Sequence, residues 1–135
     1  EIKDKKRIIC ENTEWIAFVP YAARYPFEIH IAPKRTVAAM ADLDEAQSEL
    51  FAPIAKEALT RLDGVFGIEM AYIASWYQAP VNVGRDCMRL HWQIVSVRRQ
   101  PGKLKYLSGS ESAMGAFIMD LEPEQSAKQL QEVKY

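Results

Sequence analysis

The stretch LHWQIVSV, from Leu90 to Val97, is the clearest β-strand signal in the chain, and the fold is predicted outward from it. Successive side chains of a strand point to opposite faces of a sheet. One face takes Leu90, Trp92, Ile94 and Ser96, and the other takes His91, Gln93, Val95 and Val97. This alternation predicts a strand with a mainly apolar side and a side that carries a histidine and an amide.

Three short runs rich in β-branched and aromatic residues predict further strands near the start of the chain. They are RIIC (Arg7–Cys10), WIAFV (Trp15–Val19) and EIHIA (Glu28–Ala32). A later run, MAYIASW (Met70–Trp76), is a candidate for a buried strand. Consecutive strands that are joined by short turns favour antiparallel pairing.

A long helix is predicted after the third strand. Asp42 or Asp44 can cap its start, and Gly64 is its expected C-terminal cap. An apolar stripe recurs at every fourth position, through Ala46, Leu50, Ile54, Ala58 and Leu62. Pro53 lies inside this stretch and is expected to kink the helix or divide it in two.

The end of the chain predicts a loop, a short apolar run (Ala116–Met119) and a last helix that starts at Glu122–Pro123. This helix is expected to turn Ala127, Leu130 and Val133 inward. The order of strands and helices predicts an α+β fold, in which an antiparallel sheet has its helices packed on one face.

Length and composition are those of an ordinary globular domain. The chain has 135 residues, 49% of them hydrophobic and 26% charged, so residues 1–135 are expected to form a single domain that folds without a disulfide or a metal. Lys and Arg number 17 against 18 Asp and Glu, and this balance predicts no nucleic-acid partner and no membrane partner. Cys10 and Cys87 form no CxxC pair and are expected to be free thiols in a reducing compartment.

The chain has two histidines, and His91 permits two interpretations. His91 and Gln93 share a strand face at a spacing of about 7 Å, where a histidine and polar neighbours can present a nucleophile to a phosphate. His91 can equally be a hydrogen-bonded residue at the edge of the core. His30, alone on its alternating strand, is expected to pack or to form a hydrogen bond.

The loop KLKYLSGSESAMG (Lys103–Gly115) offers a candidate ligand site. Backbone amides in a loop rich in Gly and Ser can cradle phosphate, and a carboxylate such as that of Glu111 can accept sugar hydroxyls. With the ring of Tyr106 added, this mixture suits a sugar better than a nucleotide base, although the pattern also fits an ordinary surface loop. The sequence has no GxxxxGK[ST] phosphate loop, no Ser–His–Asp set and no paired-carboxylate motif.

Five separated segments together resemble one family. They are Glu11–Arg35, Tyr72–Val81 (YIASWYQAPV), Leu90–Val97, Lys103–Ile118 and the closing EPEQSAKQLQEV. In this order they resemble the C-terminal half of the galactose-1-phosphate uridylyltransferases, which are two-lobed members of the histidine-triad superfamily. The stretch KLKYLSGSES is most similar to the actinobacterial-type members. The resemblance covers nearly the whole chain and implies a histidine-triad-like lobe.

The resemblance also implies a reaction, in which a uridylyl group moves from UDP-glucose to galactose 1-phosphate through a covalent uridylyl-histidine. The family's nucleophile lies in a His-Pro-His-Gly-Gln motif of the N-terminal half, and this chain has no such motif. Gln93 stands where single-lobe histidine-triad hydrolases carry the attacking histidine. The chain is therefore expected to hold no catalytic residue and to be inactive alone, while His91 and Gln93 could line a cleft.

The hexose side of the family's site does carry over. The family's KFMVGYE stretch, which contacts sugar hydroxyls, is similar to Lys105–Glu111. The resemblance thus implies hexose-binding roles for Lys105, Tyr106, Ser108, Ser110 and Glu111. Glu111 keeps the family's carboxylate, whereas Ser108 and Ser110 replace larger residues. In the family this loop reaches into the neighbouring subunit, which implies a homodimer.

Some family members bind iron through a histidine in a WHGAP stretch and two histidines in HWQLHAH. The matching positions here hold Tyr77, Val95 and Val97, and valine offers no ligand atom, so the site is expected to be lost and no cofactor is expected. The partners that the resemblance implies are hexose 1-phosphate and a UDP-sugar, both in the intact enzyme. It also implies a cytoplasmic protein of galactose metabolism.

The chain begins at Glu1 rather than Met, which, with the missing nucleophile, fits the C-terminal portion of a longer uridylyltransferase. Two other hypotheses stay open. The chain could be a stand-alone, non-catalytic histidine-triad-like module that binds a sugar phosphate or a partner chain. It could also be an independent nucleotide hydrolase or phosphorylase, against which Gln93 argues.

Overall fold

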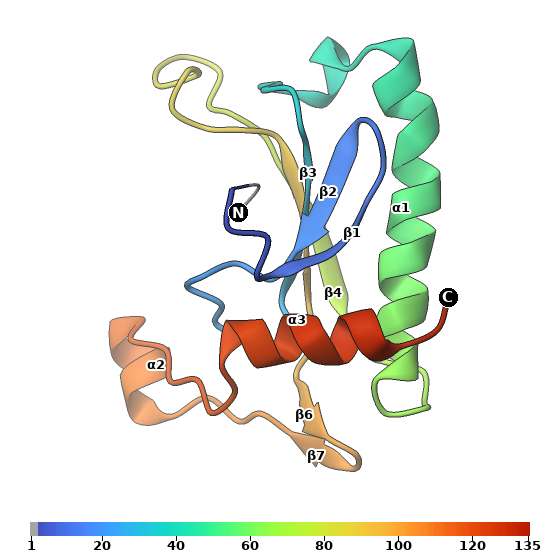
Figure 1. Cartoon of the computed structure of the whole chain (residues 1–135). Coiled ribbons are helices and arrows are strands. Elements are labelled where there is room, and N and C mark those ends of the chain that lie inside the picture. The colour runs from blue at the N-terminus through green and yellow to red at the C-terminus, as the bar shows by residue number, and fades with distance from the viewer. Residues whose placement is uncertain (1–2) are drawn as a thin grey trace.

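The computed structural model describes residues 3–135, and Figure 1 shows its sheet, its helices and the two chain ends. The strands are β1 (Ile8–Glu11), β2 (Trp15–Phe18), β3 (Ile29–Pro33), β4 (Ile73–Tyr77), β5 (His91–Val95), β6 (Arg98–Gln100) and β7 (Lys103–Leu104). The helices are the 3-10 turn η1 (Met40–Asp42), α1 (Glu45–Gly64), α2 (Gly109–Met114) and α3 (Pro123–Glu132). No helix in this part of the chain is long and apolar enough to cross a membrane.

The main sheet has five strands in the order β1-β2-β3-β5-β4, and every neighbouring pair is antiparallel. Strands β6 and β7 form a separate hairpin. Helix α1 packs against β1, β2 and β3, and α3 packs against β1 and α1, so both lie on one face of the sheet (Figure 1). This arrangement confirms the predicted α+β class.

The core lies between the sheet and these two helices. Its largest fully buried apolar side chains include Trp15, Phe27, Ile29, Ile31, Leu62, Ile94 and Leu130. Trp15 also satisfies its ring N–H, because Nε1 donates to the carbonyl oxygen of Gln47 at 2.7 Å. Burial of this set leaves the opposite face of the sheet free to form a site.

Local signals predict the first residues of α1 and α3 correctly. Asp44 caps α1, since its carboxylate accepts from the backbone N–H of Gln47 at 2.9 Å. Pro123 is the first residue of α3, as predicted. The apolar stripe of α1 needs one correction, because Ala46 is exposed and Gln47 is buried in its place. Pro53 lies inside α1 but does not divide it.

Two further expectations about the strands and loops are corrected. The run Met70–Trp76 is not a buried strand: β4 is an edge strand that leaves Ile73 and Tyr77 exposed. Residues 100–115 are not a simple loop, since they contain the turn of the β6–β7 hairpin, strand β7 and α2. The run Ala116–Met119 forms neither strand nor helix.

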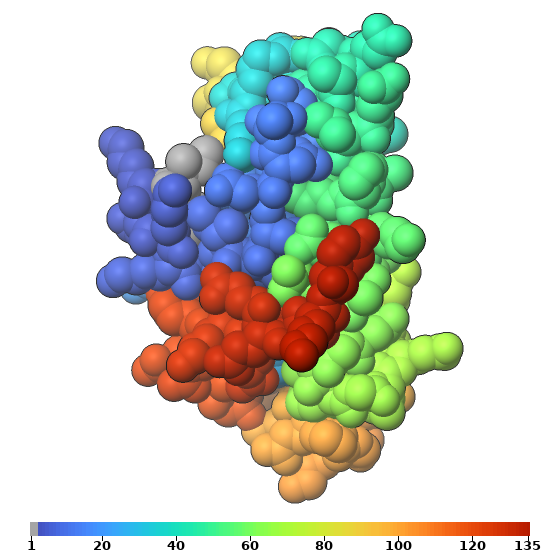
Figure 2. All heavy atoms as spheres, turned by 45° about the vertical axis from the view of Figure 1, so that its right-hand side comes forward, coloured from blue at the N-terminus to red at the C-terminus, as the bar shows by residue number. Residues whose placement is uncertain are grey.

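Gly64 is the last residue of α1 rather than its cap, and it is needed for close packing. A Cβ at this position would overlap Cγ1 of Val133, which follows α3. Arg61 joins the same two segments, because its Nη1 donates to the carbonyl oxygens of Leu130, Gln131 and Val133. In Figure 2 the red C-terminal residues lie against the green end of α1.

We expect Gly64→Ala to destabilise the chain by about 1 to 2 kcal/mol, because overpacking outweighs the gain in helix propensity. The free energy of unfolding in urea measures the change. In a Val133→Ala background the same substitution should be neutral or stabilising, since the overlapping methyl groups are gone. An equal loss in both backgrounds would contradict the proposed contact.

Candidate functional site

The face of the sheet opposite α1 carries a row of rings that crosses four strands. Tyr77 on β4 stacks on His91 of β5, with ring centroids 5.1 Å apart and planes 6° apart. His91 stacks in turn on His30 of β3 at 5.0 Å. Phe18 of β2 meets His30 edge-on at 5.8 Å. The antiparallel register produces the row, because it places Tyr77 opposite His91 and Phe18 opposite His30.

A buried carboxylate holds the centre of this row. Glu28 is 2% exposed, and its Oε1 lies 2.9 Å from Nε2 of His30 and accepts from Nε2 of Gln93 at 2.9 Å. Its Oε2 accepts from the backbone N–H of Arg24 at 2.8 Å. Burial raises the pKa of Glu28, but the bonds to His30 and Arg24 and the nearby positive charges outweigh it and lower the pKa overall. His30 and Gln93 are thus fixed by an ionised carboxylate.

His91 has a defined tautomer. Its Nδ1 lies 2.9 Å from the carbonyl oxygen of Arg89, which can only accept, so Nδ1 carries the hydrogen. Burial lowers the pKa of His91; the bond to Arg89 opposes this shift, and the charge of His30 adds to it. The ring is therefore neutral near pH 7, with a lone pair on Nε2.

We expect His91 to titrate below the ordinary imidazole value of 6.5 and to hold its neutral hydrogen on Nδ1. Nitrogen-15 NMR of the two ring nitrogens over a pH series measures both properties. A His91 pKa at or above 6.5, or a hydrogen on Nε2, would contradict this geometry.

The candidate hexose loop begins where the β6–β7 hairpin returns the chain to the end of β5. Gly102 has a φ of +68° in the turn, a conformation that glycine adopts without strain. The backbone N–H of Lys105 then donates to the carbonyl oxygen of Val97 at 2.6 Å. Ser108 caps α2, and Gly115 ends the helix in the left-handed conformation with a φ of +65°.

Lys105 and Glu111 form a buried ion pair inside this loop. Nζ of Lys105 lies 2.8 Å from Oε1 of Glu111, and the two side chains are 6% and 3% exposed. The other ammonium hydrogens go to the carbonyl oxygens of Arg24 and Ile118, at 2.6 and 2.7 Å. The Nζ also lies 5.5 Å from the ring centre of Tyr25. Lys105 therefore joins the loop to the segment that leads into β3.

Glu111 is held on both carboxylate oxygens. Oε1 also accepts from the N–H of Ile118 at 3.1 Å, and Oε2 accepts from the N–H of Ser108 at 2.7 Å. Lys105 first, and then these two amides, lower the pKa of Glu111 to about 2. A carboxylate offers about four acceptor positions, so one remains on Oε2 for a ligand hydroxyl.

The other predicted hexose residues are more accessible. Tyr106 is 83% exposed, and Ser108 and Ser110 are half-buried with their hydroxyl oxygens 2.9 Å apart. Lys105, Tyr106, Ser108 and Glu111 share a hollow of about 180 Å³ with Arg99, Ile118 and Asp120. This volume is below the roughly 300 Å³ of a typical ligand pocket, so these residues alone can line only part of a hexose phosphate site.

The positions matched to the family's iron ligands do not assemble a metal site. Tyr77 stacks on His91, Val95 pairs with Ile73 across the β4–β5 edge, and Val97 lies beyond the end of β5. Over residues 3–135, no group of three or more His, Cys, Asp or Glu side chains is placed to hold a metal ion. The residues at these three positions therefore do not fit an iron ion.

Sequence reasoning did not identify Glu28 as a site residue. The signal for this cluster is the alternation EIH, which puts Glu28 and His30 on one side of β3. Gln93 reaches Glu28 only because β5 pairs with β3, a non-local fact. Arg24 and Ile118, which hold Lys105, are separated from it in the sequence and gave no signal.

The whole chain, residues 1–135, matches the family described as "Galactose-1-phosphate uridyl transferase, C-terminal domain". It is 31% identical over 136 residues to the galactose-1-phosphate uridylyltransferase of Thermotoga maritima, covering 99% of this chain and 43% of that protein. It is 35% identical to the enzyme of the same name from Streptomyces lividans, covering 95% and 39%. The chain thus spans about two fifths of the length of these curated relatives.

Solved structures agree with this comparison. A structure described as that of a uridylyltransferase superposes with a TM-score of 0.89 at 35% identity, covering 96% of this chain and 41% of the other. A histidine-triad-like protein from Bartonella henselae superposes with a TM-score of 0.61 at 14% identity, covering 93% of this chain and 84% of that one, which shows a shared fold alone.

Proposed function

This chain belongs to the family of galactose-1-phosphate uridylyltransferase C-terminal domains, and from that premise we propose that it is the hexose-binding lobe of a longer uridylyltransferase. The longer protein would transfer a uridylyl group between UDP-glucose and a hexose 1-phosphate. The attacking histidine would come from the remaining three fifths of the protein, because His30 and His91 lie in no His-Pro-His motif.

The observation that carries this proposal is the ordered loop Lys105–Glu111. The buried Lys105–Glu111 pair and the capping of α2 by Ser108 fix the backbone, so that the loop needs little further ordering when a ligand binds. The hydroxyls of Ser108 and Ser110 and the remaining acceptor position of Glu111 then meet sugar hydroxyls. Tyr106 would cover the sugar from the solvent side.

A homodimer and a cytoplasmic location belong to the same proposal. Exposed apolar side chains on and beside the loop support the dimer, since Tyr106, Leu107 and Met114 are 83%, 44% and 80% exposed. Such side chains fit a loop that reaches across a subunit interface. Sedimentation of the longer protein, with and without Met114→Glu, tests the dimer: the variant should shift the mass toward the monomer.

The test of function is uridylyl transfer by the longer protein that contains this domain. Incubation with UDP-glucose and galactose 1-phosphate should yield UDP-galactose and glucose 1-phosphate, followed by coupled assay or NMR. The 135-residue chain alone should show neither transfer nor UDP-sugar hydrolysis. Hydrolysis by the chain alone, or no transfer by the longer protein, would reject the assignment.

A further inference from the structure

We propose that Glu28 is a positioning residue for the loop Lys105–Glu111 and acts on it through the backbone of Arg24. The inference rests on the proposed function, because it gives Glu28 an indirect part in hexose 1-phosphate binding. Glu28 immediately precedes β3 and is 2% exposed. Within residues 3–135 its carboxylate bonds to Arg24, His30 and Gln93 and to no residue of the loop. A bonded path from Glu28 to the loop therefore has to begin at Arg24.

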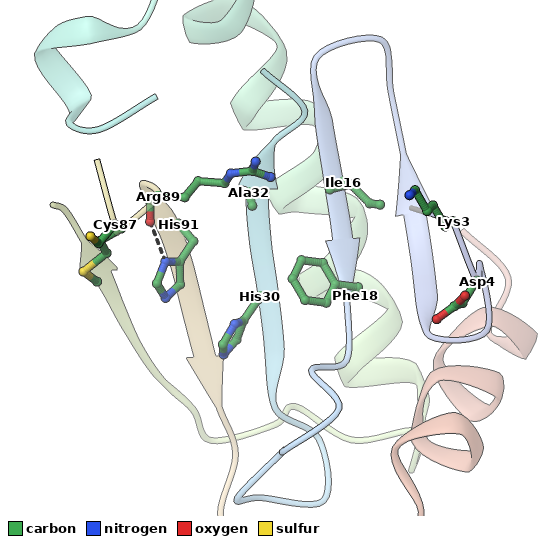
Figure 3. Close-up of a pocket in the computed structure, with 10 residues that line it drawn as sticks. Lys3, Asp4, Ile16, Phe18, His30, Ala32, Cys87, Arg89 and His91 are labelled. Carbon is green, nitrogen blue, oxygen red and sulfur yellow. Dashed lines mark hydrogen bonds between the residues drawn. The ribbon is translucent and has the colours of Figure 1, made fainter. Parts of the chain in front are cut away.

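Two paired strands fix the carboxylate of Glu28. Its Oε1 lies 2.9 Å from Nε2 of His30 on β3 and accepts from Nε2 of Gln93 on β5, also at 2.9 Å. His30 and Gln93 are register partners, so both bonds come from one rung of the sheet. Figure 3 shows the ring of His30 between those of Phe18 and His91, which pack against its two sides. The sheet thus sets the direction in which Oε2 of Glu28 points.

The backbone of Arg24 is bonded through both of its polar groups. Its N–H donates to Oε2 of Glu28 at 2.8 Å, and its carbonyl oxygen accepts from Nζ of Lys105 at 2.6 Å. The same ammonium lies 2.8 Å from Oε1 of Glu111 and donates to the carbonyl oxygen of Ile118 at 2.7 Å. Glu28, Arg24, Lys105 and Glu111 therefore form one continuous row of bonds, which is called the relay below.

Glu28 matters to the relay because the segment between β2 and β3 contains no strand or helix of its own. Oγ of Ser126 donates to the carbonyl oxygen of Pro26 at 2.6 Å and holds the middle of this segment. Without Glu28, the N–H of Arg24 would lose its one partner within residues 3–135, while Pro26 would stay bonded. An unpaired donor turns toward water, since leaving it without a partner is costly. The carbonyl oxygen that holds Lys105 would move with it.

Amide hydrogen exchange of the 135-residue chain tests the relay without any substrate. The N–H groups of Ser108 and Ile118 report on loop order, because both donate to Glu111. Glu28→Leu should speed exchange at both amides roughly 3- to 10-fold, which corresponds to the loss of about one hydrogen bond. Glu28→Gln keeps a carbonyl oxygen that can accept from Arg24, so exchange should stay within about twofold of the unaltered chain.

The matched control is Ile31→Val, which shortens a fully buried side chain of β3 and leaves every bond of the relay in place. It should lower the melting temperature of the chain without changing exchange at Ser108 and Ile118, because the loop opens locally. A loss of stability and a loss of loop order are thereby measured separately.

The relay can also be broken from its other end, which keeps the proposal testable if Glu28→Leu does not fold. Lys105→Met removes the donor to the carbonyl oxygen of Arg24. Because coupling between two sites is reciprocal, exchange at the N–H of Arg24 should rise roughly 3- to 10-fold. Unchanged exchange at Arg24 in this variant would overturn the relay.

The effect on substrate is measured in the proposed longer uridylyltransferase. Glu28→Leu should raise KM for hexose 1-phosphate roughly 3- to 10-fold, and Glu28→Gln should restore it. In a Lys105→Met background Glu28→Leu should add no further change, because the relay is already broken. An equal effect in both backgrounds would show that Glu28 acts by another route and would overturn the proposal.

Exchange and kinetics together separate the two levels of the inference. Equal exchange at Ser108 and Ile118 in Glu28→Leu and in the unaltered chain would overturn the relay, whatever the loop binds. Faster exchange with an unchanged KM would uphold the relay and reject the proposed hexose-binding role of the loop. Faster exchange together with a raised KM, both restored by Glu28→Gln, is the expected result.

Discussion

Glu111→Ala, made in the proposed longer uridylyltransferase, should lower hexose 1-phosphate turnover by roughly 10- to 1000-fold, the range expected when a charged acceptor of substrate hydroxyls is lost. Both oxygens of Glu111 are already bonded within the loop, and Oε2 keeps one acceptor position, which a hexose would use in the proposed site. The substitution removes that acceptor and also loosens the loop. Steady-state kcat and KM for the hexose 1-phosphate measure the combined loss.

A substrate that lacks one hydroxyl separates these two effects. If Glu111 accepts from a sugar hydroxyl, a hexose 1-phosphate deoxygenated at that carbon should lose much less on going from the unaltered protein to Glu111→Ala. Glu69→Ala, at an exposed carboxylate on the loop before β4, is the matched control and should leave turnover unchanged. Equal losses with both substrates would show that Glu111 acts through loop order alone.

The fold could be predicted where the signal is local. Alternation in LHWQIVSV fixes β5, the Asp44 side chain fixes the start of α1, and Pro123 fixes the start of α3. Each of these depends on residues a few positions apart, which sequence patterns report directly. Antiparallel pairing of β1 with β2 also follows from the short turn between them, whereas the connection from β2 to β3 is longer and runs from Val19 to Glu28.

The errors share a non-local cause. The apolar run that forms β4 was expected to be buried. The strand order places β4 at the edge of the sheet, where every second residue is exposed. Gly64 was expected to cap α1, but a glycine is needed there because Val133, from the far end of the chain, packs against it. Strand order and close packing between distant segments leave no periodic trace in a single sequence.

In the candidate site, too, some features could be predicted from the sequence and others depend on contacts between distant segments. The resemblance selects the stretch Lys105–Glu111, and the structure places Lys105, Ser108, Ser110 and Glu111 together while Tyr106 extends into solvent. That Lys105 and Glu111 are buried against each other depends on Arg24 and Ile118, which lie far from Lys105 or across α2. The resemblance therefore names the residues of the loop, and only the fold shows which of them are buried in contacts within it and which are accessible.

Lys105→Met should lower the melting temperature on the order of 10 °C, because it leaves a buried carboxylate without its cation. The ammonium of Lys105 makes three bonds, to Glu111 and to the carbonyl oxygens of Arg24 and Ile118, and Met replaces none of them. Lys103→Met, at an exposed lysine two residues earlier, is the matched control. Circular dichroism at neutral pH measures both, and equal melting temperatures would show that the pair contributes nothing.

Lowering the pH should reduce the difference in melting temperature between Lys105→Met and the unaltered chain. The pKa of Glu111 is lowered from 4.5 to about 2, so its ionised form stabilises the fold above pH 4.5. That contribution is lost as the pH falls through the folded value, where Glu111 takes a proton. The difference in melting temperature should therefore be constant above pH 5 or so and shrink between pH 4.5 and 2. A difference that stays constant down to pH 2 would mean that Lys105 stabilises the loop through the carbonyls of Arg24 and Ile118 rather than through Glu111.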